Sequence, residues 1–151
     1  FAKYFSTLFK QKKITKYYIA LCEGNPKNNI SQVTLNIKNK KQKFEDSLTN
    51  YKILYKKNGI SQILYNPKTG KTHQLRIVSK NLGCPIIGDK KYNIFSKFKN
   101  EKLMLHAYCL RFSIEDQIFE FVADLPDHFL AFTKNNKLKK MSNYKKYLNS
   151  F

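Results

Sequence analysis

Apolar and polar residues alternate along much of this chain with a period of two, which is typical of β-strands that bury one face. The stretch ISQVTLNI places Val33, Leu35 and Ile37 between polar neighbours, so these three side chains are predicted to face a core. The other runs of this kind are rich in β-branched and aromatic residues. Strands are predicted at residues 14–22, 30–37, 49–56, 60–66, 103–114 and 117–123.

Turn residues separate these runs and indicate how the strands connect. Asn58-Gly59 lies between two of them, and Asn-Gly in that position is a strong signal for a β-hairpin. Glu115-Asp116 separates the last two runs in the same way. The charged stretch 38–46 is predicted to be a solvated loop.

Three segments have helical spacing instead: 2–12, 72–82 and 127–134. In 72–82 the spacing of Leu75, Val78 and Leu82 gives one core-facing stripe. Thr72 is placed to cap the first turn, and Gly83 follows the last one. Short hairpins and few helices favour an α+β fold with a mixed, mostly antiparallel sheet and flanking helices.

Composition adds a partner to this picture. The 151 residues carry 29 Lys and Arg against 10 Asp and Glu, a formal net charge of +19. Such an excess favours a polyanionic partner, above all nucleic acid. An AT-rich genome would also explain abundant Lys and Asn, but it does not explain why acids are scarce.

Cysteine and hydrophobicity patterns exclude several classes of protein. The three cysteines, Cys22, Cys84 and Cys109, are far apart and show no C-x-x-C spacing, so neither a disulfide framework nor a zinc site is predicted. Reduced thiols in a cytosol or an organelle interior fit better. No apolar run approaches 18 residues and no signal peptide is recognisable, so no membrane span is expected.

One stretch concentrates the candidate chemistry: PKTGKTHQLRIVSKNLGCPIIGDKKY, residues 67–92. It contains Arg76, one of only two arginines in a lysine-rich chain. The planar guanidinium of an arginine can hold a carboxylate with two hydrogen bonds, so Arg76 should face an acid if it is partly buried. Lys68 and Lys71 precede the predicted helix start, a natural position for a phosphate. A surface helix with ordinary basic residues explains the same spacing.

Residues 67–92 also resemble the signature of the RluA-type pseudouridine synthases, which isomerise specific uridines in RNA. Three further blocks match in the same order. They are K-x-Y-x-A-x-x-x-G at 16–24, L-H-A-x-x-L-x-F at 105–112 and a closing segment, FVADLP, at 121–126. The resemblance is greatest to the branch that modifies large-subunit ribosomal RNA.

The resemblance implies roles by position. Tyr18 matches the tyrosine that stacks on the target base, and Arg76 matches the arginine that pairs with the catalytic aspartate. Leu105 lies in the block that forms an apolar wall of the base pocket. Four residues are expected to position RNA backbone or base: Lys71, Thr72, His73 and Gln74. From the residues alone, a strand tyrosine in a half-buried sheet is the favoured interpretation of Tyr18, and the motif context reverses that preference.

The family's catalytic aspartate lies in an H-R-L-D-x-x-T-S-G motif that these 151 residues do not contain. In the family, a segment resembling Phe1-Ala2-Lys3 follows shortly after that motif. We therefore expect residues 1–134 to be the C-terminal portion of a catalytic domain and 135–151 to be a basic tail. We also expect this chain alone to be inactive.

The resulting hypothesis is an RNA pseudouridine synthase that needs no metal and no other cofactor. Its expected partner is ribosomal RNA, with transfer RNA as the other option, in a bacterial cytoplasm or an organelle interior. The alternative is a non-catalytic RNA-binding relic or ribosome-assembly factor. A third interpretation is a ribosome-associated basic protein of unrelated descent. The sequence does not predict the oligomeric state.

Overall fold

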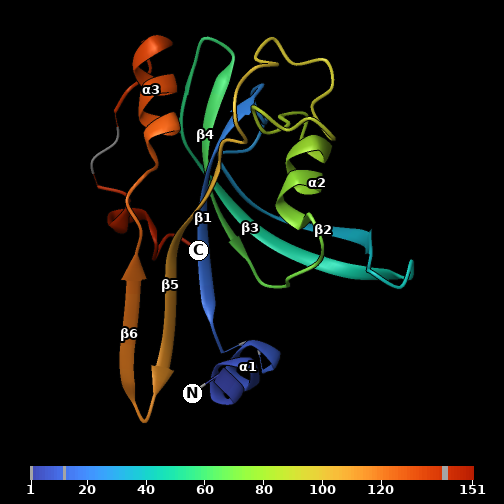
Figure 1. Ribbon diagram of the computed structural model, residues 1–151, viewed down its shortest axis with the longest axis vertical. Coiled ribbons are helices and arrows are strands. Elements are labelled where there is room, and N and C mark those ends of the chain that lie inside the picture. Colours follow the sequence, from blue (N-terminus) through green and yellow to red (C-terminus); the bar gives the residue numbers. More distant parts are fainter. Residues whose placement is uncertain (1, 12, 141–142) are drawn as a thin grey trace.

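A single antiparallel sheet organises the protein (Figure 1). The computed structural model describes residues 2–11, 13–140 and 143–151. The sheet has six strands in the order β2-β3-β4-β1-β5-β6, and each of these pairings is antiparallel. The elements are α1 (Ala2–Lys10), β1 (Thr15–Glu23), β2 (Ile30–Lys38), β3 (Phe44–Lys57), β4 (Ile60–Pro67), α2 (Gln74–Asn81), β5 (Leu105–Ile114), β6 (Gln117–Val122), α3 (Asp127–Asn135) and the 3₁₀ helix η1 (Lys145–Tyr147).

The predicted α+β class and all six predicted strands are confirmed. The turn at Asn58-Gly59 connects β3 to β4, and both residues have positive φ angles, which Asn and Gly tolerate best. The predicted loop at 38–46 was wrong. Only 39–43 form a turn there, and Phe44, Glu45 and Asp46 continue the ladder opposite β2. This end of the ladder is largely solvated, so its charged side chains do not oppose strand formation.

The three predicted helices are also present, with small shifts at their ends. The predicted end of the first helix at Lys12 lies outside the described residues, and α1 closes at Lys10. The α2 helix begins at Gln74 rather than Thr72, and its predicted core stripe holds, since Leu75 and Val78 are buried and Leu82 packs against the core. Gly83 follows α2 with a φ of +74°, as expected for the residue after a helix.

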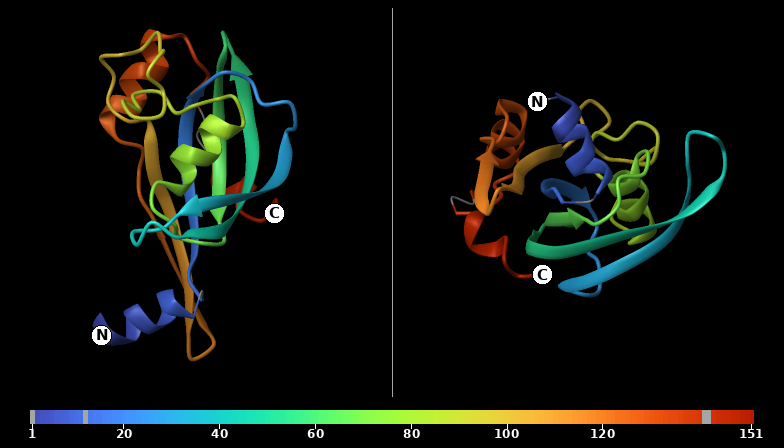
Figure 2. Two further views of the ribbon diagram at one scale, coloured as in Figure 1. Left: turned by 90° about the vertical axis from the view of Figure 1, so that its right-hand side faces the viewer. Right: turned by 90° about the horizontal axis from the view of Figure 1, so that it is seen from below.

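The core lies around the two central strands. β1 and β4 are buried over most of their length because both sheet faces are covered there. Val78 of α2 and Phe129 and Phe132 of α3 join the same cluster. Figure 2 shows α1 apart from this body, beside the far end of the β5–β6 hairpin. There Leu8, Ile14 and Phe112 form a second, smaller cluster.

The segment after α3 contributes to the main core. Leu138, Tyr144 and Leu148 are buried, and the Tyr144 hydroxyl accepts a hydrogen bond from the Gln62 side chain on β4. The basic character predicted for 135–151 is thus combined with an apolar face that packs on the sheet. Among the helices of the described residues, none has both the length and the apolar character required to cross a membrane.

Candidate active site

A cavity of about 340 Å³ lies where four distant segments meet: the start of β1, the end of β4, the start of α2 and the start of β5. Six of the seven predicted site residues line it. They are Tyr18, Lys71, His73, Gln74, Arg76 and Leu105. Thr72 instead lines a neighbouring cavity together with Lys40, Lys41 and Lys43 of the β2–β3 turn. The fold therefore gathers residues 87 positions apart, from Tyr18 to Leu105, at one place.

The register of β1 explains how Tyr18 reaches this cavity. Tyr18 pairs with Tyr65 on β4 and with Ala107 on β5, and the β1–β5 register shifts between Tyr17 and Tyr18. The extra residue of this bulge, Tyr108, lies on β5, and such bulges occur often beside active sites. Tyr17 is buried, whereas Tyr18 is only half-buried at the cavity. Burial raises the pKa of the Tyr18 hydroxyl, so this group stays protonated at neutral pH.

Arg76 faces an acid, as its partial burial required, and that acid is Asp89. The Nε and Nη2 atoms of Arg76 each donate a hydrogen bond of 2.8 Å to one carboxylate oxygen of Asp89. The Asp89 side chain has no exposed surface, and that of Arg76 is 20 % exposed. The guanidinium carbon also lies 5.0 Å from the centre of the Tyr92 ring. These contacts fix the orientation of the guanidinium at the cavity.

Asp89 is held ionised by its partners. Burial alone would raise the pKa of its carboxyl group, but the hydrogen bonds from Arg76 and from the backbone N–H groups of Tyr92 and Lys91 outweigh this effect, and the pKa is lowered. In return, Asp89 raises the pKa of the Arg76 guanidinium. Asp89 therefore joins α2 to the loop that follows it.

The start of α2 differs from the prediction for Thr72. His73, not Thr72, is the residue before the helix, and no side chain caps the first turn there. His73 has a left-handed backbone with a φ of +54°, and its Nδ1 lies 3.1 Å from the Tyr92 hydroxyl. Burial lowers the pKa of His73, and the nearby positive charges of Arg76 and Lys91 act in the same direction. His73 is thus favoured in its neutral form at the cavity.

Gln74 is engaged within the protein. Its Oε1 accepts hydrogen bonds from the Thr69 hydroxyl and the Lys71 backbone N–H, and its Nε2 donates to the Leu48 carbonyl and the Thr49 hydroxyl. All four hydrogen-bonding positions of the carboxamide are filled. Direct contact with a base would break one of these bonds. The geometry therefore favours a structural role for Gln74, in which it holds the loop at 67–73.

Lysines give the cavity its positive charge. Lys71 forms an ion pair with Glu45 of β3. Lys16 lies on β1 two residues before Tyr18, and burial lowers the pKa of its amine. Gly70 lies beside Nζ of Lys16, and both residues line the cavity. Leu105 opens β5 opposite Ala20 and supplies an apolar wall.

Three residues of the site were not singled out from the sequence: Lys16, Asp89 and Tyr92. Lys16 could have been found from the period of two, which places it on the same strand face as Tyr18. Asp89 is the only acid within residues 67–92. It was therefore the nearest acid in the sequence that could pair with Arg76, but predicting this pair required knowing how the loop folds back on α2. No sequence signal points to Tyr92 as a partner of both His73 and Arg76.

The described residues contain no group of three or more His, Cys, Asp or Glu side chains arranged to hold a metal ion. The site thus consists of an aromatic ring, a fixed guanidinium, an apolar wall and lysines. This set can hold a planar base and bind an anion.

Comparisons with known proteins agree with this picture. The family model for RNA pseudouridylate synthase matches residues 1–81. The chain is 35 % identical over 152 aligned residues to ribosomal large subunit pseudouridine synthase D of Borreliella burgdorferi, an alignment that covers 89 % of this chain and 47 % of that protein. It is 38 % identical to ribosomal large subunit pseudouridine synthase C of Rickettsia conorii, over 80 % of this chain and 45 % of that protein. The chain thus spans about half the length of these curated relatives.

The fold has close counterparts among solved structures. Human RNA pseudouridylate synthase domain containing 4 superimposes with a TM-score of 0.82 at 23 % identity, over 93 % of this chain and 69 % of that one. Human RNA pseudouridylate synthase domain containing 1 gives a TM-score of 0.75 at 24 % identity. Taken with the family model and the curated relatives, the four sequence blocks identify this chain as a member of the RNA pseudouridylate synthase family.

Proposed function

We propose that this chain forms part of an enzyme that isomerises uridine to pseudouridine in RNA, with large-subunit ribosomal RNA as its substrate. The observation that carries the proposal is the cavity in which Tyr18, Arg76 and Leu105 meet. The names of the curated relatives support ribosomal RNA as the substrate, and the net charge of +19 supports an RNA partner in general.

The reaction defines what the cavity must do. The glycosidic bond between C1′ of the ribose and N1 of the uracil breaks, the base turns, and a bond forms between C1′ and C5. C5 then loses its proton, and N1 gains one. No atoms are gained or lost overall. The base must leave its stack to be reached. In our proposal the ring of Tyr18 stacks on the extruded uracil, Leu105 walls the pocket, and Arg76 orients the carboxylate that acts on the sugar or the base.

Asp89 does not fit the role of that carboxylate. Its side chain is fully buried behind Arg76, and its oxygens already accept hydrogen bonds from the guanidinium and from two backbone N–H groups. A carboxylate with this environment cannot approach a ribose without breaking the loop that holds it. We therefore assign Asp89 to positioning Arg76.

We propose that the acting carboxylate is supplied from outside these 151 residues, since none of their five aspartates follows Arg-Leu. The Asp89 pair uses two of the five N–H donors of Arg76, so a second carboxylate can bind the same guanidinium on another edge. We propose that residues 1–134 are the C-terminal portion of the catalytic domain, that 135–151 form its basic tail, and that the chain alone does not turn over substrate. Bacterial relatives favour a bacterial cytoplasm as its location.

The net charge of +19 suits a second candidate equally well: a non-catalytic RNA binder that has kept the geometry of the site. The coding frame upstream of Phe1 distinguishes the two. A frame that encodes Arg-Leu-Asp shortly before Phe1 supports the enzyme. A stop codon, or a frame in which that aspartate is replaced, supports the binder.

The enzymatic proposal is tested with the full-length protein as encoded and with residues 1–151 alone. Both are incubated with transcribed large-subunit ribosomal RNA, and pseudouridine is mapped by carbodiimide modification and reverse transcription. We expect new stops with the full-length protein and none with the shorter chain. Stops with residues 1–151 alone would contradict the need for an outside carboxylate, and binding without stops by the full-length protein would favour the binder.

A further inference from the structure

The loop between α2 and β5 holds a feature that the candidate active site does not use. Phe95 is 91 % exposed, the most exposed of the large apolar side chains in the described residues, and its neighbour Ile94 is 60 % exposed. The loop is the yellow segment above α2 in Figure 1. Single exposed apolar side chains are common on protein surfaces, so the surroundings of Phe95 decide whether it has a partner.

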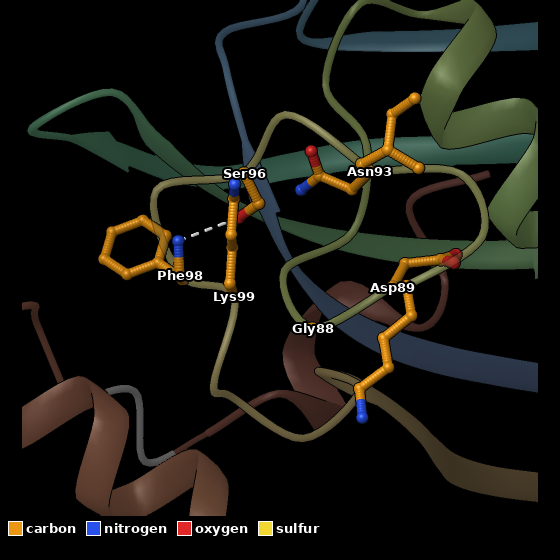
Figure 3. Close-up of a pocket in the computed structure, with 8 residues that line it drawn as sticks. Gly88, Asp89, Asn93, Ser96, Phe98 and Lys99 are labelled. Carbon is orange, nitrogen blue, oxygen red and sulfur yellow. Dashed lines mark hydrogen bonds between the residues drawn. The ribbon is translucent and has the colours of Figure 1, made fainter.

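The residues beside Phe95 are held firmly in place. The carboxylate of Glu23, at the end of β1, accepts hydrogen bonds from the Ser96 hydroxyl at 2.6 Å, the Lys97 backbone N–H at 3.0 Å and the Asn93 side chain at 3.1 Å. Ser96 is buried, and its hydroxyl also accepts a bond from the Phe98 backbone N–H (Figure 3). Phe95 is therefore presented at the tip of an anchored turn.

The base of the loop is equally fixed. A Cβ atom on Gly88 would lie 2.0 Å from the Lys102 carbonyl oxygen, so the two ends of the loop touch there. Asp89 binds the backbone of Lys91 and Tyr92 on one side and Arg76 on the other. The loop is thus tied directly to the guanidinium of the candidate active site.

The charge of the loop selects the kind of partner. Residues 88–102 carry five exposed lysines: Lys90, Lys91, Lys97, Lys99 and Lys102. Of the two acids in this range, Asp89 is buried and paired, which leaves Glu101. No ion pair links any of the five lysines to another part of the described chain. A cavity of about 250 Å³ opens between Lys90, Asn93 and Lys99, with Asp89 in its wall (Figure 3).

We propose that the 88–102 loop is a second RNA contact, in which Phe95 stacks on an unpaired base outside the target pocket and the lysines bind the adjacent phosphates. The inference rests on the proposed function, because it takes RNA as the substrate. An aromatic face with lysines around it binds single-stranded RNA without a sequence code, since every base has a π-face and every linkage a charge. The link through Asp89 places this contact next to the target site along the same RNA.

The test uses the full-length protein and two RNA probes, transcribed large-subunit ribosomal RNA and a 12-nucleotide oligouridylate. The variants are Phe95→Ala, Phe95→Leu and Phe95→Trp. Loss of one base stack should weaken oligouridylate binding about 5- to 100-fold in the Ala variant. Leucine keeps the apolar bulk but lacks a ring, so Phe95→Leu should bind as weakly, whereas Phe95→Trp should bind like the wild type.

A second variant tests the lysines. Replacing Lys97 and Lys99 by glutamine should lower the slope of log affinity against log salt by about 0.7 for each phosphate contact that is lost. Wild-type affinity of Phe95→Ala for the oligouridylate, or equal affinity of the leucine and tryptophan variants, would overturn the inference. An acidic protein would then be the better candidate for the partner of this loop. If the wild-type protein itself binds neither RNA, the proposed function fails, so the two failures are distinguishable.

Discussion

Arg76 and Asp89, 13 residues apart, are joined by two parallel hydrogen bonds of 2.8 Å between α2 and the loop that follows it. The only other arginine, Arg111, also donates two hydrogen bonds to a carboxylate, that of Glu120, but at an exposed site on the β5–β6 hairpin. Both arginines therefore donate two hydrogen bonds to one carboxylate, while lysines supply the remaining positive charge. The two pairs differ in the burial of the acid, with 0 % of the Asp89 side chain and 26 % of the Glu120 side chain exposed, and in geometry, since Arg111 donates both bonds to the same oxygen.

Replacing Asp89 by asparagine should destabilise the protein by about 2 kcal/mol. The buried side chain keeps its shape but loses the negative charge to which the Arg76 guanidinium and two backbone N–H groups donate hydrogen bonds. Glu120→Gln, at the exposed pair, should cost less than about 1 kcal/mol. Urea unfolding at neutral pH measures both. Equal costs for the two variants would mean that burial does not strengthen the Arg76 pair.

The same pair should shape the acid limb of the stability curve. The folded-state pKa of Asp89 is lowered, so its contribution is fully present above the pKa of an unfolded aspartate and is lost as the pH falls through the lowered value. Unfolding free energy measured from pH 7 down to pH 3 should therefore fall less steeply in Asp89→Asn than in the wild type. Parallel curves for the two proteins would show that Asp89 does not titrate abnormally.

A substitution that keeps the charge of Arg76 tests the need for its shape. Arg76→Lys should lower the rate of pseudouridine formation by the full-length protein by at least about 100-fold. The ammonium group of a lysine is not planar and cannot bind Asp89 and a second carboxylate along two edges, as the guanidinium can. Arg111→Lys is the matched control and should leave the rate within about 2-fold. Isomerisation of ribosomal RNA is the readout. A similar rate for both variants would contradict the assignment of Arg76 to the site.

Much of the fold could be predicted from local chemistry. The Asn58-Gly59 turn and the alternation in β2 are decided by residues close in sequence, so both were predicted correctly. The start of β3 was missed because Phe44–Asp46 look like a charged loop, and only the ladder with Asn36–Lys38 makes them a strand. Which acid meets Arg76 depended likewise on the path of a long loop, which no local pattern encodes.

The predicted roles of Tyr18 can be separated by two variants of the full-length protein. Phe keeps the ring without the hydroxyl, and Leu removes the ring. If stacking on the base is the main role, Tyr18→Leu should weaken RNA binding by about 1–3 kcal/mol, whereas Tyr18→Phe should bind like the wild type. If the hydroxyl also assists the reaction, the Phe variant should show a lower kcat with unchanged KM. Unchanged binding in Tyr18→Leu would remove Tyr18 from the base pocket.

The closure of the 88–102 loop gives the last prediction. Gly83 and Gly88 have similar positive φ angles, +74° and +79°, but a Cβ atom on Gly83 would meet nothing within 4 Å, whereas one on Gly88 would lie 2.0 Å from the Lys102 carbonyl oxygen. Gly83→Ala should therefore cost only the backbone strain, about 1 kcal/mol. Gly88→Ala should cost at least about 3 kcal/mol, because the carbonyl belongs to the backbone and both ends of the loop must move. Thermal unfolding of the two variants compares these effects. Equal losses of stability in the two variants would mean that the loop ends are not in contact. The conclusion that the loop holds Phe95 in a fixed position would then lack support at that end.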